Sequence, residues 1–483
     1  MTTARQSNGP IAVLVAVALV PALVLFGLLR VVGGDSSPST EPVALNPAAD
    51  VVPAVVSGRA VLTLRRTAAE LSGRVNRSSL GSSLQPVLAA MAPASCLAVS
   101  VDGVALDLPT GPAAIPASTV KVLIATAALE MLGPDFRFAT TVMGPAPVDG
   151  VVNGDVVVVG GGDPVLSSDW YPASGMERHP VMSPTSLDEL ARAMASGGVT
   201  AITGRVLGDG SRYDDEYEVA DWADDIFGIE AGPYDALMAN DARVEGDQYR
   251  WDDPVGAAAA EFRLRLGAIG ISSSSSGGQS SPASGSVELA RIESAPLTDI
   301  VKEMLMTSDN NTAEMLVKEL GFTEHGIGSR VDGLAAVSSA LTRLGVPTDG
   351  MTLVDGSGLA STSRVECRTL VEAIGRAPEG VIDGLPVAGV SGTLSQIFVG
   401  TAMEGRLRGK TGTLGNPPYD QDPPAVKALA GQFVADGGEQ ITFALLLNQS
   451  MVNDQSVYRP IWDALAAAFA AYPAGVGVVE LGP

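Results

Sequence analysis

The sequence predicts an α+β fold that is divided into more than one domain. The chain has 483 residues, which exceeds the size of one ordinary hydrophobic core. Residues 428–448, ALAGQFVADGGEQITFALLLN, contain two alternating, β-prone arms about an Asp-Gly-Gly turn, which indicates a hairpin. Helical patterns cover residues 296–321 and about 455–471. We therefore expect two or three domains that contain both helices and strands.

A candidate membrane anchor lies near the start of the chain. Residues Ile11 to Leu29 are uncharged and almost all aliphatic. As a helix they span about 28 Å, roughly the hydrocarbon thickness of a bilayer. No convincing A-x-A cleavage site and no lipobox cysteine follow. We expect an uncleaved anchor in the cell membrane with the rest of the chain extracytoplasmic. The protein is secreted if the segment is a cleaved signal peptide.

The composition divides the chain into four sections. Residues 34–55 are small, polar and rich in proline, which is typical of a disordered tether. The local composition changes again between residues 141 and 289, which form either a separate domain or an insertion into the first one. The expected sections are 1–33 (a cytoplasmic tip with the anchor or signal), 34–55 (the tether), 56–140 together with 290–475 (one catalytic-looking domain) and 141–289 (the inserted domain or domains).

Residues 141–289 are called the middle section below, and two elements are expected before it. CLAVSVDGVAL (96–106) has the pattern of two strands joined by an Asp-Gly turn. A helix is expected from Ser118 to about Leu132, where a Gly-Pro pair would end it. This helix is almost wholly apolar, yet it contains Lys121.

Short strands and helices are also expected in the middle section. GDVVVVGGGDP (154–164) predicts a buried strand followed by a turn, and AITGRVLGDG (201–210) predicts another strand. LDELARAMASGG (187–198) predicts a helix that is closed by glycine. Residues 271–286, ISSSSSGGQSSPASGS, are of low complexity and predict a flexible loop.

Helical patterns return after the middle section. Residues 296–321 predict two helices that are broken at residues 307–310, with Asn311 and Glu314 spaced as the N-x-x-E start of the second helix. The remaining elements are a tight turn in VDGSGL (354–359), a helix near 366–376 and a strand in RLRGKTGTLG (406–415). For Asp355 and Ser357, a role in the turn is favoured over contact with the substrate.

The charge of the chain excludes one class of partner and draws attention to the lysines. The net charge is −24 and the pI is about 4.4. This composition argues against nucleic acid, because binding to phosphates needs clustered Lys and Arg. The chain has only five lysines, so a motif that uses lysine seldom arises in it by chance. They are Lys121, Lys302, Lys318, Lys410 and Lys427.

The cysteines and histidines predict no metal site. Cys96 and Cys367 form no C-x-x-C pair, and His179 and His325 form no H-E-x-x-H motif. In an exported protein the two cysteines could form a disulfide. Two buried free thiols are the alternative, and the sequence leaves both open.

Ser118 and Lys121 have the spacing of an activated nucleophile and its base. Residues i and i+3 share one face of a helix. A serine hydroxyl needs a base to take its proton, and a lysine in apolar surroundings loses its charge more readily and can serve as that base. A capping serine with a solvent-seeking lysine is the plainer interpretation of S-x-x-K alone, but the motif occurs once in this chain.

Two further triplets complete the set. At the predicted helix break, Ser308 and Asn310 of S-D-N offer a second hydroxyl and a carboxamide, although such a triplet alone is usually a helix cap. On the predicted strand, Lys410 and Thr411 of K-T-G suit a substrate carboxylate, and Gly412 leaves room for another backbone. The stretch GRLRGKT also resembles a phosphate-binding P-loop, but it is one residue too short between its glycines and no helix follows.

The three triplets S-x-x-K, S-x-N and K-T-G together form the signature of serine β-lactamases and penicillin-binding proteins. The longer segments resemble the DacB-type D-Ala-D-Ala carboxypeptidases/endopeptidases, the class C low-molecular-mass penicillin-binding proteins, over roughly residues 60–470. These segments are PASTVKVLIATAALEMLGPDFRF, GGGDPVL, TSDNNTAEMLVKELG, VDGSGLAS, LPVAGVSGTL and GKTGTL.

The resemblance implies a fold and a reaction. The fold is a penicillin-binding, β-lactamase-like transpeptidase domain, with an antiparallel sheet flanked by helices and an α/β block inserted between the first and second motifs. The reaction is cleavage of peptidoglycan stem peptides through an acyl-enzyme that β-lactams trap, and it uses no metal or organic cofactor. GGGDPVL is expected to be structural, with Asp163 as its one chemically active side chain.

The resemblance also implies a role for each motif residue. Ser118 is the nucleophile and Lys121 its base, Ser308 passes a proton to the leaving D-alanine, and Asn310 orients the acyl amide. The substrate is bound by Lys410, Thr411, Gly412 and Thr413, where Lys410 and Thr411 bind the terminal carboxylate and the N–H of Thr413 forms the oxyanion hole with that of Ser118.

Two other functions compete with this one. A class A β-lactamase has similar motifs, but the 190 residues between Ser118 and Ser308 are far more than such an enzyme contains. A non-catalytic, penicillin-sensing or scaffolding homologue would not need a paired Ser and Lys. We therefore expect a serine-type D-Ala-D-Ala carboxypeptidase/endopeptidase.

Overall fold

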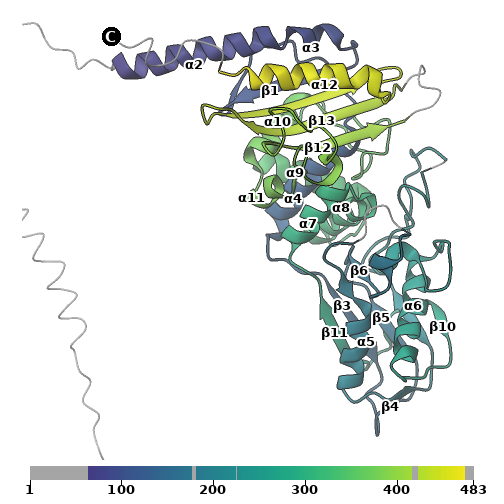
Figure 1. Cartoon of the computed structure of the whole chain (residues 1–483). Helices are drawn as coiled ribbons and strands as arrows, with labels where there is room; N and C mark the ends of the chain where they lie inside the picture. The colour runs from purple at the N-terminus through teal and green to yellow at the C-terminus, as the bar shows by residue number, and fades with distance from the viewer. Residues whose placement is uncertain (1–63, 177–180, 225, 416–422, 474–483) are drawn as a thin grey trace, which may run out of the picture. The chain divides into compact units, whose positions relative to one another are not determined.

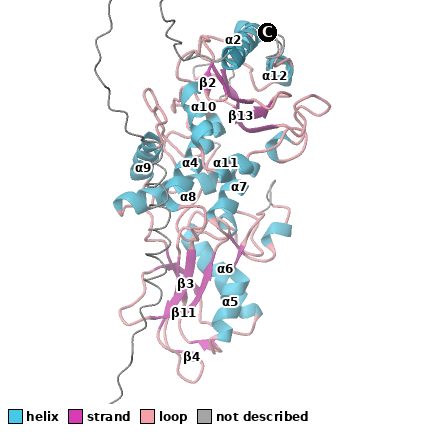
Figure 2. Ribbon diagram, turned by 90° about the vertical axis from the view of Figure 1, so that its left-hand side faces the viewer, coloured by secondary structure: helices cyan, strands magenta, loops and turns pink. Residues whose placement is uncertain are grey.

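The computed structural model describes residues 64–176, 181–224, 226–415 and 423–473 (Figures 1 and 2). The candidate anchor and the expected tether lie outside these residues. Within the described ranges, no helix combines the length and the apolar character that crossing a bilayer requires.

The first sheet has five strands, and every neighbouring pair in it is antiparallel. The predicted strand pair and the predicted hairpin are both confirmed, and the strand that carries K-T-G lies at one edge. In spatial order the strands are β12 (Leu407–Leu414), β13 (Val426–Val434), β14 (Gln440–Asn448), β1 (Cys96–Val101) and β2 (Val104–Ala105).

Helices cover both faces of this sheet because its central strands are apolar on both sides. On β14, Ala444 and Leu446 face one core, whereas Leu445 and Leu447 face the other. The second core is shared with α2 (Leu64–Ser83), α3 (Gln85–Ala90) and α12 (Gln455–Ala470). The first is shared with α4 (Lys121–Leu132) and α10 (Cys367–Arg376), and Figure 1 shows the two groups of helices on opposite sides of the strands. The predicted fold class is confirmed.

The α4 helix explains why the run after Ser118 is apolar all round. Nine of its twelve residues are buried, and they include Lys121. A helix without a polar face must be enclosed by other elements. The enclosing helices are α7 (Leu297–Thr307), α8 (Asn310–His325), α9 (Arg330–Arg343), α10 and α11 (Glu379–Gly384).

A second five-stranded sheet is formed by residues from the middle of the chain (Figure 2). It is parallel between β5 (Val156–Val159), β9 (Val206–Asp209) and β10 (Ser276–Gln279). It is antiparallel where β3 (Ala139–Gly144) pairs with β5 and with β11 (Val287–Glu293). Because β3 and β11 are paired, the chain enters and leaves this sheet through neighbouring strands. In spatial order the strands are β10, β9, β5, β3 and β11.

Two helices and several short elements complete this part of the chain. The helices α5 (Leu187–Ser196) and α6 (Pro254–Ala268) share one apolar core with the strands. The short elements are β4 (Val151–Val152) with β8 (Ala201–Ile202), β6 (Leu166–Ser167) with β7 (Thr185–Ser186), and the 3-10 turns η2 (Tyr171–Ala173) and η3 (Asn240–Ala242).

Two local predictions are corrected by the structure. The expected loop of residues 271–286 contains the edge strand β10, because backbone groups alone pair with β9 and the Ser-rich side chains are not needed for it. The second helix of the 296–321 segment begins at Asn310, where the Asp309 side chain accepts a hydrogen bond from the backbone N–H of Thr312. Asp309, and not Asn311, is therefore the cap of α8.

Cys96 and Cys367 form a disulfide, which settles the alternative that the sequence left open. The Cα atoms are 5.8 Å apart, and the bond joins the start of β1 to the first residue of α10. The two residues are separated by 271 positions in the sequence.

Candidate active site

Ser118 lies in a 3-10 turn, η1 (Ala117–Val120), that leads directly into α4. The preceding residue, Ala117, has a positive φ of 45°, which a residue with a side chain rarely adopts. Gly358 permits this bend, because a Cβ on it would lie 2.1 Å from the carbonyl oxygen of Ala117. The predicted helix start is thus a tight turn that presents Ser118 at the surface of a pocket.

Lys121 is fully buried and connects the first two motifs. Its Nζ donates to Ser118 Oγ at 3.1 Å and to Asn310 Oδ1 at 2.7 Å. A third hydrogen bond, 2.6 Å long, goes to the backbone carbonyl of Ser357. The predicted nucleophile and its predicted base are therefore in direct contact.

The break between α7 and α8 brings the second motif into the same site. Ser308 ends α7 with a left-handed conformation (φ 66°, ψ 32°), which turns the chain so that Asn310 can begin α8. Asn310 accepts from Lys121 and donates through Nδ2 to the backbone carbonyl of Glu230 at 2.8 Å. One carboxamide thus joins the base to a segment of the middle section.

The third motif approaches from the edge strand β12. The buried Lys410 Nζ donates to Ser308 Oγ at 2.9 Å and to the carbonyl of Thr411 at 2.9 Å. Thr411 Oγ1 donates at 2.7 Å to Oγ1 of Thr393, which lies in the short turn η4 (Gly392–Leu394). A Cβ on Gly412 would lie 2.9 Å from the carbonyl of Pro116. Gly412 therefore permits the close backbone approach that the sequence predicted.

The motif residues surround a pocket of about 640 Å³. Ser118, Ser308 and Asn310 line it from the helical side, and Thr411 and Thr413 line it from β12. Lys121 and Lys410 lie beneath this lining. All eight residues that the sequence singled out are therefore in one place, and Gly412 contributes by its lack of a side chain.

Burial sets the protonation of the two lysines. Burial lowers the pKa of Lys121 to about 8, although the charges of Asp309, Asp355 and Glu314 act in the opposite direction. The pKa of Lys410 is held well below its usual value by burial, and the charge of Lys121 adds to this effect. Lys121 can consequently exist as a free amine near neutral pH, which a proton acceptor requires.

The D-G-S-G-L turn holds the acceptor of Lys121 in place. The buried Asp355 carboxylate accepts from the backbone N–H groups of Leu359 at 2.8 Å and Ala360 at 2.7 Å, and it also accepts from Trp222 Nε1. In the structure, Asp355 and Ser357 thus form part of this turn, as the sequence favoured.

Glu314 is a supporting residue that the sequence placed in a different role. It accepts from the backbone N–H of Ser357 at 2.7 Å and from that of Gly356 at 3.1 Å. Burial and the nearby Asp355 raise the pKa of Glu314 to about 7. Its position on α8 was visible in the sequence, but its partner lies 43 residues away and no local pattern points to it.

Asp241 brings a carboxylate from the middle section to the pocket. It lies in η3, where Asn240, Asp241 and Ala242 all have positive φ values of 54°, 52° and 61°. Asp241 accepts from Asn311 Nδ2 at 2.9 Å and from Tyr171 Oη at 2.7 Å. Nothing in the sequence marked Asp241, because its place depends on this unusual turn.

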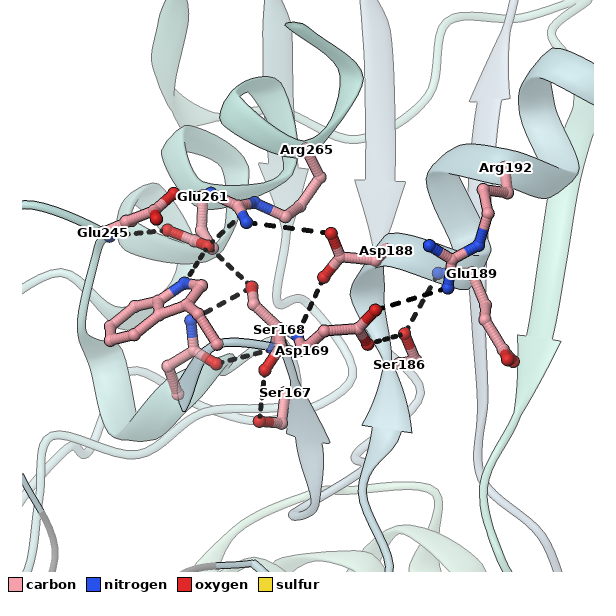
Figure 3. Close-up of polar contacts among 12 residues, drawn as sticks. Ser167, Ser168, Asp169, Ser186, Asp188, Glu189, Arg192, Glu245, Glu261 and Arg265 are labelled. Carbon is pink, nitrogen blue, oxygen red and sulfur yellow. Dashed lines mark hydrogen bonds and ion pairs between the residues drawn. The ribbon is translucent and has the colours of Figure 1, made fainter. Parts of the chain in front are cut away.

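A buried polar cluster supports the η3 turn (Figure 3). The fully buried Glu261 accepts from Ser168 Oγ at 2.6 Å and forms an ion pair with Arg265. Ser168 in turn donates its backbone N–H to Asn240 Oδ1 at 2.7 Å. The cluster thus fixes the first residue of the strained turn, which gives the turn the support that positive φ values require.

Comparisons with known proteins identify a family for this chain. Residues 86–250 and 239–472 match the model of the D-Ala-D-Ala carboxypeptidase 3 (S13) family. A carboxypeptidase DacB of Mycolicibacterium smegmatis is 30% identical over 370 residues, which are 73% of this chain and 74% of the relative. A D-alanyl-D-alanine carboxypeptidase of an Actinomadura species is 27% identical over 443 residues, covering 74% of this chain and 77% of the relative.

Solved structures support the fold. The crystal structure of penicillin binding protein 4 (dacB) from Haemophilus influenzae aligns with a TM-score of 0.65 at 21% identity, covering 80% of this chain and 99% of that one. The same protein in complex with a β-lactam aligns with a TM-score of 0.58 at 20% identity, covering 79% and 99%. The resemblance drawn from the motifs is confirmed: this chain belongs to the D-Ala-D-Ala carboxypeptidase 3 (S13) family and is a serine-type carboxypeptidase.

Proposed function

We propose that the protein hydrolyses the D-Ala-D-Ala ends and D-Ala cross-links of peptidoglycan stem peptides through an acyl-enzyme on Ser118, and that β-lactams trap this intermediate. The observation that carries the proposal is the pair of contacts in one pocket, Lys121 to Ser118 and Lys410 to Ser308. The β-lactam complex of the Haemophilus influenzae protein supports the inhibitor class.

In the acylation step, the Lys121 amine takes the proton of Ser118 Oγ, which attacks the carbonyl carbon of the penultimate D-alanine. The developing oxyanion accepts from the backbone N–H groups of Ser118 and Thr413. Asn310 orients the acyl amide. Its Nδ2 already donates to the carbonyl of Glu230, so it offers the kind of hydrogen bond that an acyl carbonyl would accept.

In the departure step, the C–N bond breaks and Ser308 passes a proton to the leaving amine. The terminal carboxylate of the leaving residue is bound by Lys410 and Thr411. A carboxylate beside Lys410 favours its charged form, which offsets the effect of burial on that lysine. Water then adds to the acyl carbonyl, the ester bond to Ser118 breaks, and the shortened peptide is released.

We also propose that the protein is attached to the cell membrane through residues 11–29, with the catalytic part outside the cytoplasm. Peptidoglycan is an extracytoplasmic substrate, and a disulfide such as Cys96–Cys367 suits an oxidising compartment. The protein is secreted if the segment is cleaved.

Intact-protein mass spectrometry of the chain mixed with benzylpenicillin tests the function, with Ser118→Ala as the control. We expect a persistent penicilloyl adduct on Ser118 and none on the variant. Rapid penicillin hydrolysis without a lasting adduct would indicate a β-lactamase instead. A folded protein that forms no adduct and hydrolyses no penicillin would indicate a non-catalytic homologue.

A further inference from the structure

Lys427 is a lysine at the pocket that the three motifs do not account for. It lies on β13 directly opposite Thr413 of β12, so the two side chains are on the same face of the sheet. Its Nζ donates to Thr413 Oγ1 at 2.9 Å. Both residues line the pocket that contains Ser118 and Thr411.

The surroundings of Lys427 are cationic and aromatic. Its Nζ lies 4.7 Å from the ring centre of Tyr458 and 5.8 Å from that of Trp462, and Arg459 Cζ lies 5.6 Å from the Tyr458 ring. In the ranges that the structure describes, neither Lys427 nor Arg459 forms an ion pair with a carboxylate. A lysine that lines the pocket without a carboxylate partner among the described residues is unexpected in a chain with a net charge of −24, and it favours an anionic ligand.

The hydrogen bond from Lys427 restricts the directions in which the Thr413 hydroxyl can donate, because the hydroxyl proton cannot point toward the ammonium group. A hydroxyl has one proton to donate and two lone pairs that accept. Because an ammonium group donates to Thr413 Oγ1, one lone pair is occupied and the hydroxyl proton is free to point elsewhere. The donation also polarises the hydroxyl and makes it a stronger donor. Thr413 is exposed at the pocket, so an anion bound there can accept this proton.

We propose that Lys427 is a positioning residue for the terminal carboxylate of the substrate. It orients the Thr413 hydroxyl toward that carboxylate and adds a second positive charge to the site formed by Lys410 and Thr411. This inference rests on the proposed function, because it assigns a further partner to the same carboxylate. It predicts that Lys427 acts on substrates that end in a carboxylate and not on acyl donors that lack one.

A pair of thioester substrates that differ only in their end group tests the inference. One ends in a carboxylate and the other in the matching carboxamide, and both release a thiol that can be followed continuously. The variants of the full-length protein are Lys427→Met, which removes the charge, and Lys427→Arg, which keeps it. Lys302→Met is the matched control, because Lys302 is exposed on α7 and lies outside the pocket.

For Lys427→Met we expect kcat/KM on the carboxylate substrate to fall about 10- to 100-fold, as expected for the loss of a charge-assisted hydrogen bond, mainly through KM. The carboxamide substrate should be hydrolysed as by the unaltered protein. Lys427→Arg should recover most of the loss, and Lys302→Met should change neither substrate.

Three results would overturn the inference. An equal loss on both substrates would mean that Lys427 only maintains the structure, and no loss on either would mean that it has no role. Equal rates of the unaltered protein on both substrates would show that the site does not recognise a carboxylate. Ser118→Ala separates these results from a failure of the proposed function, because hydrolysis that survives in that variant does not use Ser118.

Discussion

Lys121 has hydrogen-bond acceptors on three sides but forms no ion pair among the residues that the structure describes. Its partners are a hydroxyl, a carboxamide and a backbone carbonyl. Neutral acceptors stabilise an ammonium group less than a carboxylate does, so burial dominates and the amine gives up its proton near neutral pH. The lysine is thereby suited to taking a proton from Ser118.

The pKa of Lys121 predicts the pH dependence of acylation. Its folded-state pKa is lowered from 10.5 to about 8, so the free amine accumulates as the pH rises through 8. We expect the second-order rate constant for acylation by benzylpenicillin to rise between pH 6 and 9 with an apparent pKa near 8. The measurement is best made on Lys427→Arg, because the pKa of Lys427 is also lowered to about 8 by burial and by Arg459, whereas an arginine stays charged.

The control for this pH profile is Lys121→Met, which removes the amine and keeps the apolar stem. We expect acylation to fall at least about 100-fold and the rise with pH to disappear, in line with the contribution of general base catalysis. If acylation by Lys121→Met kept the same pH dependence, another group would be the base.

At the scale of single residues, the sequence predicted the groups that local spacing reveals. Ser118 and Lys121 are three residues apart, and Lys410 and Thr411 are adjacent, so each pair is visible in a short window. The carbonyl of Ser357 and the carboxylate of Asp241 were not predictable in this way. They reach the site through contacts across 236 and 70 residues, respectively, and those contacts depend on the complete fold.

At the scale of elements, the α6 helix joins the second sheet to the pocket. Glu261 on α6 is fully buried, and it accepts from Ser168 Oγ, from Trp170 Nε1 at 2.8 Å and from the backbone N–H of Glu245 at 2.8 Å. Arg265, one turn later, forms ion pairs with Glu261 and Glu245. Figure 3 shows Ser168, Glu245, Glu261 and Arg265 grouped beside Asp188 of α5.

Replacing Glu261 should therefore destabilise the protein strongly. In Glu261→Ala, three donors and the Arg265 guanidinium lose a buried acceptor, for which we expect a loss of about 3–5 kcal/mol in the free energy of unfolding. Urea denaturation measures this loss. Glu189→Ala on α5 is the control: its side chain is exposed, and we expect a change below about 1 kcal/mol. Similar midpoints for the two variants would contradict the proposed importance of the cluster.

The elements that the sequence predicted are those with a strong internal pattern. The β13–β14 hairpin alternates between two apolar cores, and the α7–α8 break carries Ser, Asp and Asn, which favour turns and caps. The strand β10 was missed because Ser276–Gln279 has no apolar alternation. Its pairing with β9 uses backbone groups, which leave no trace in the choice of side chains.

At the scale of the whole molecule, the Cys96–Cys367 disulfide connects two distant parts of the chain. It closes a loop of 271 residues, and a constraint of this length removes much conformational freedom from the unfolded chain. We expect the double variant Cys96→Ser/Cys367→Ser to lose about 2–5 kcal/mol in the free energy of unfolding. Urea denaturation of the oxidised protein beside the variant measures this difference, and equal midpoints would show that the bond contributes no stability.

The bridge also determines what a single cut in the backbone does. Ser118, Ser308 and every strand of the second sheet lie between Cys96 and Cys367. A protease that cleaves once anywhere in this stretch produces two polypeptides that remain one covalent molecule. In gel electrophoresis the two polypeptides migrate together until a reductant breaks the Cys96–Cys367 disulfide. In an oxidising compartment, the surface loops of the middle section can thus be nicked while the strand that carries Lys410 stays attached to the turn that carries Ser118.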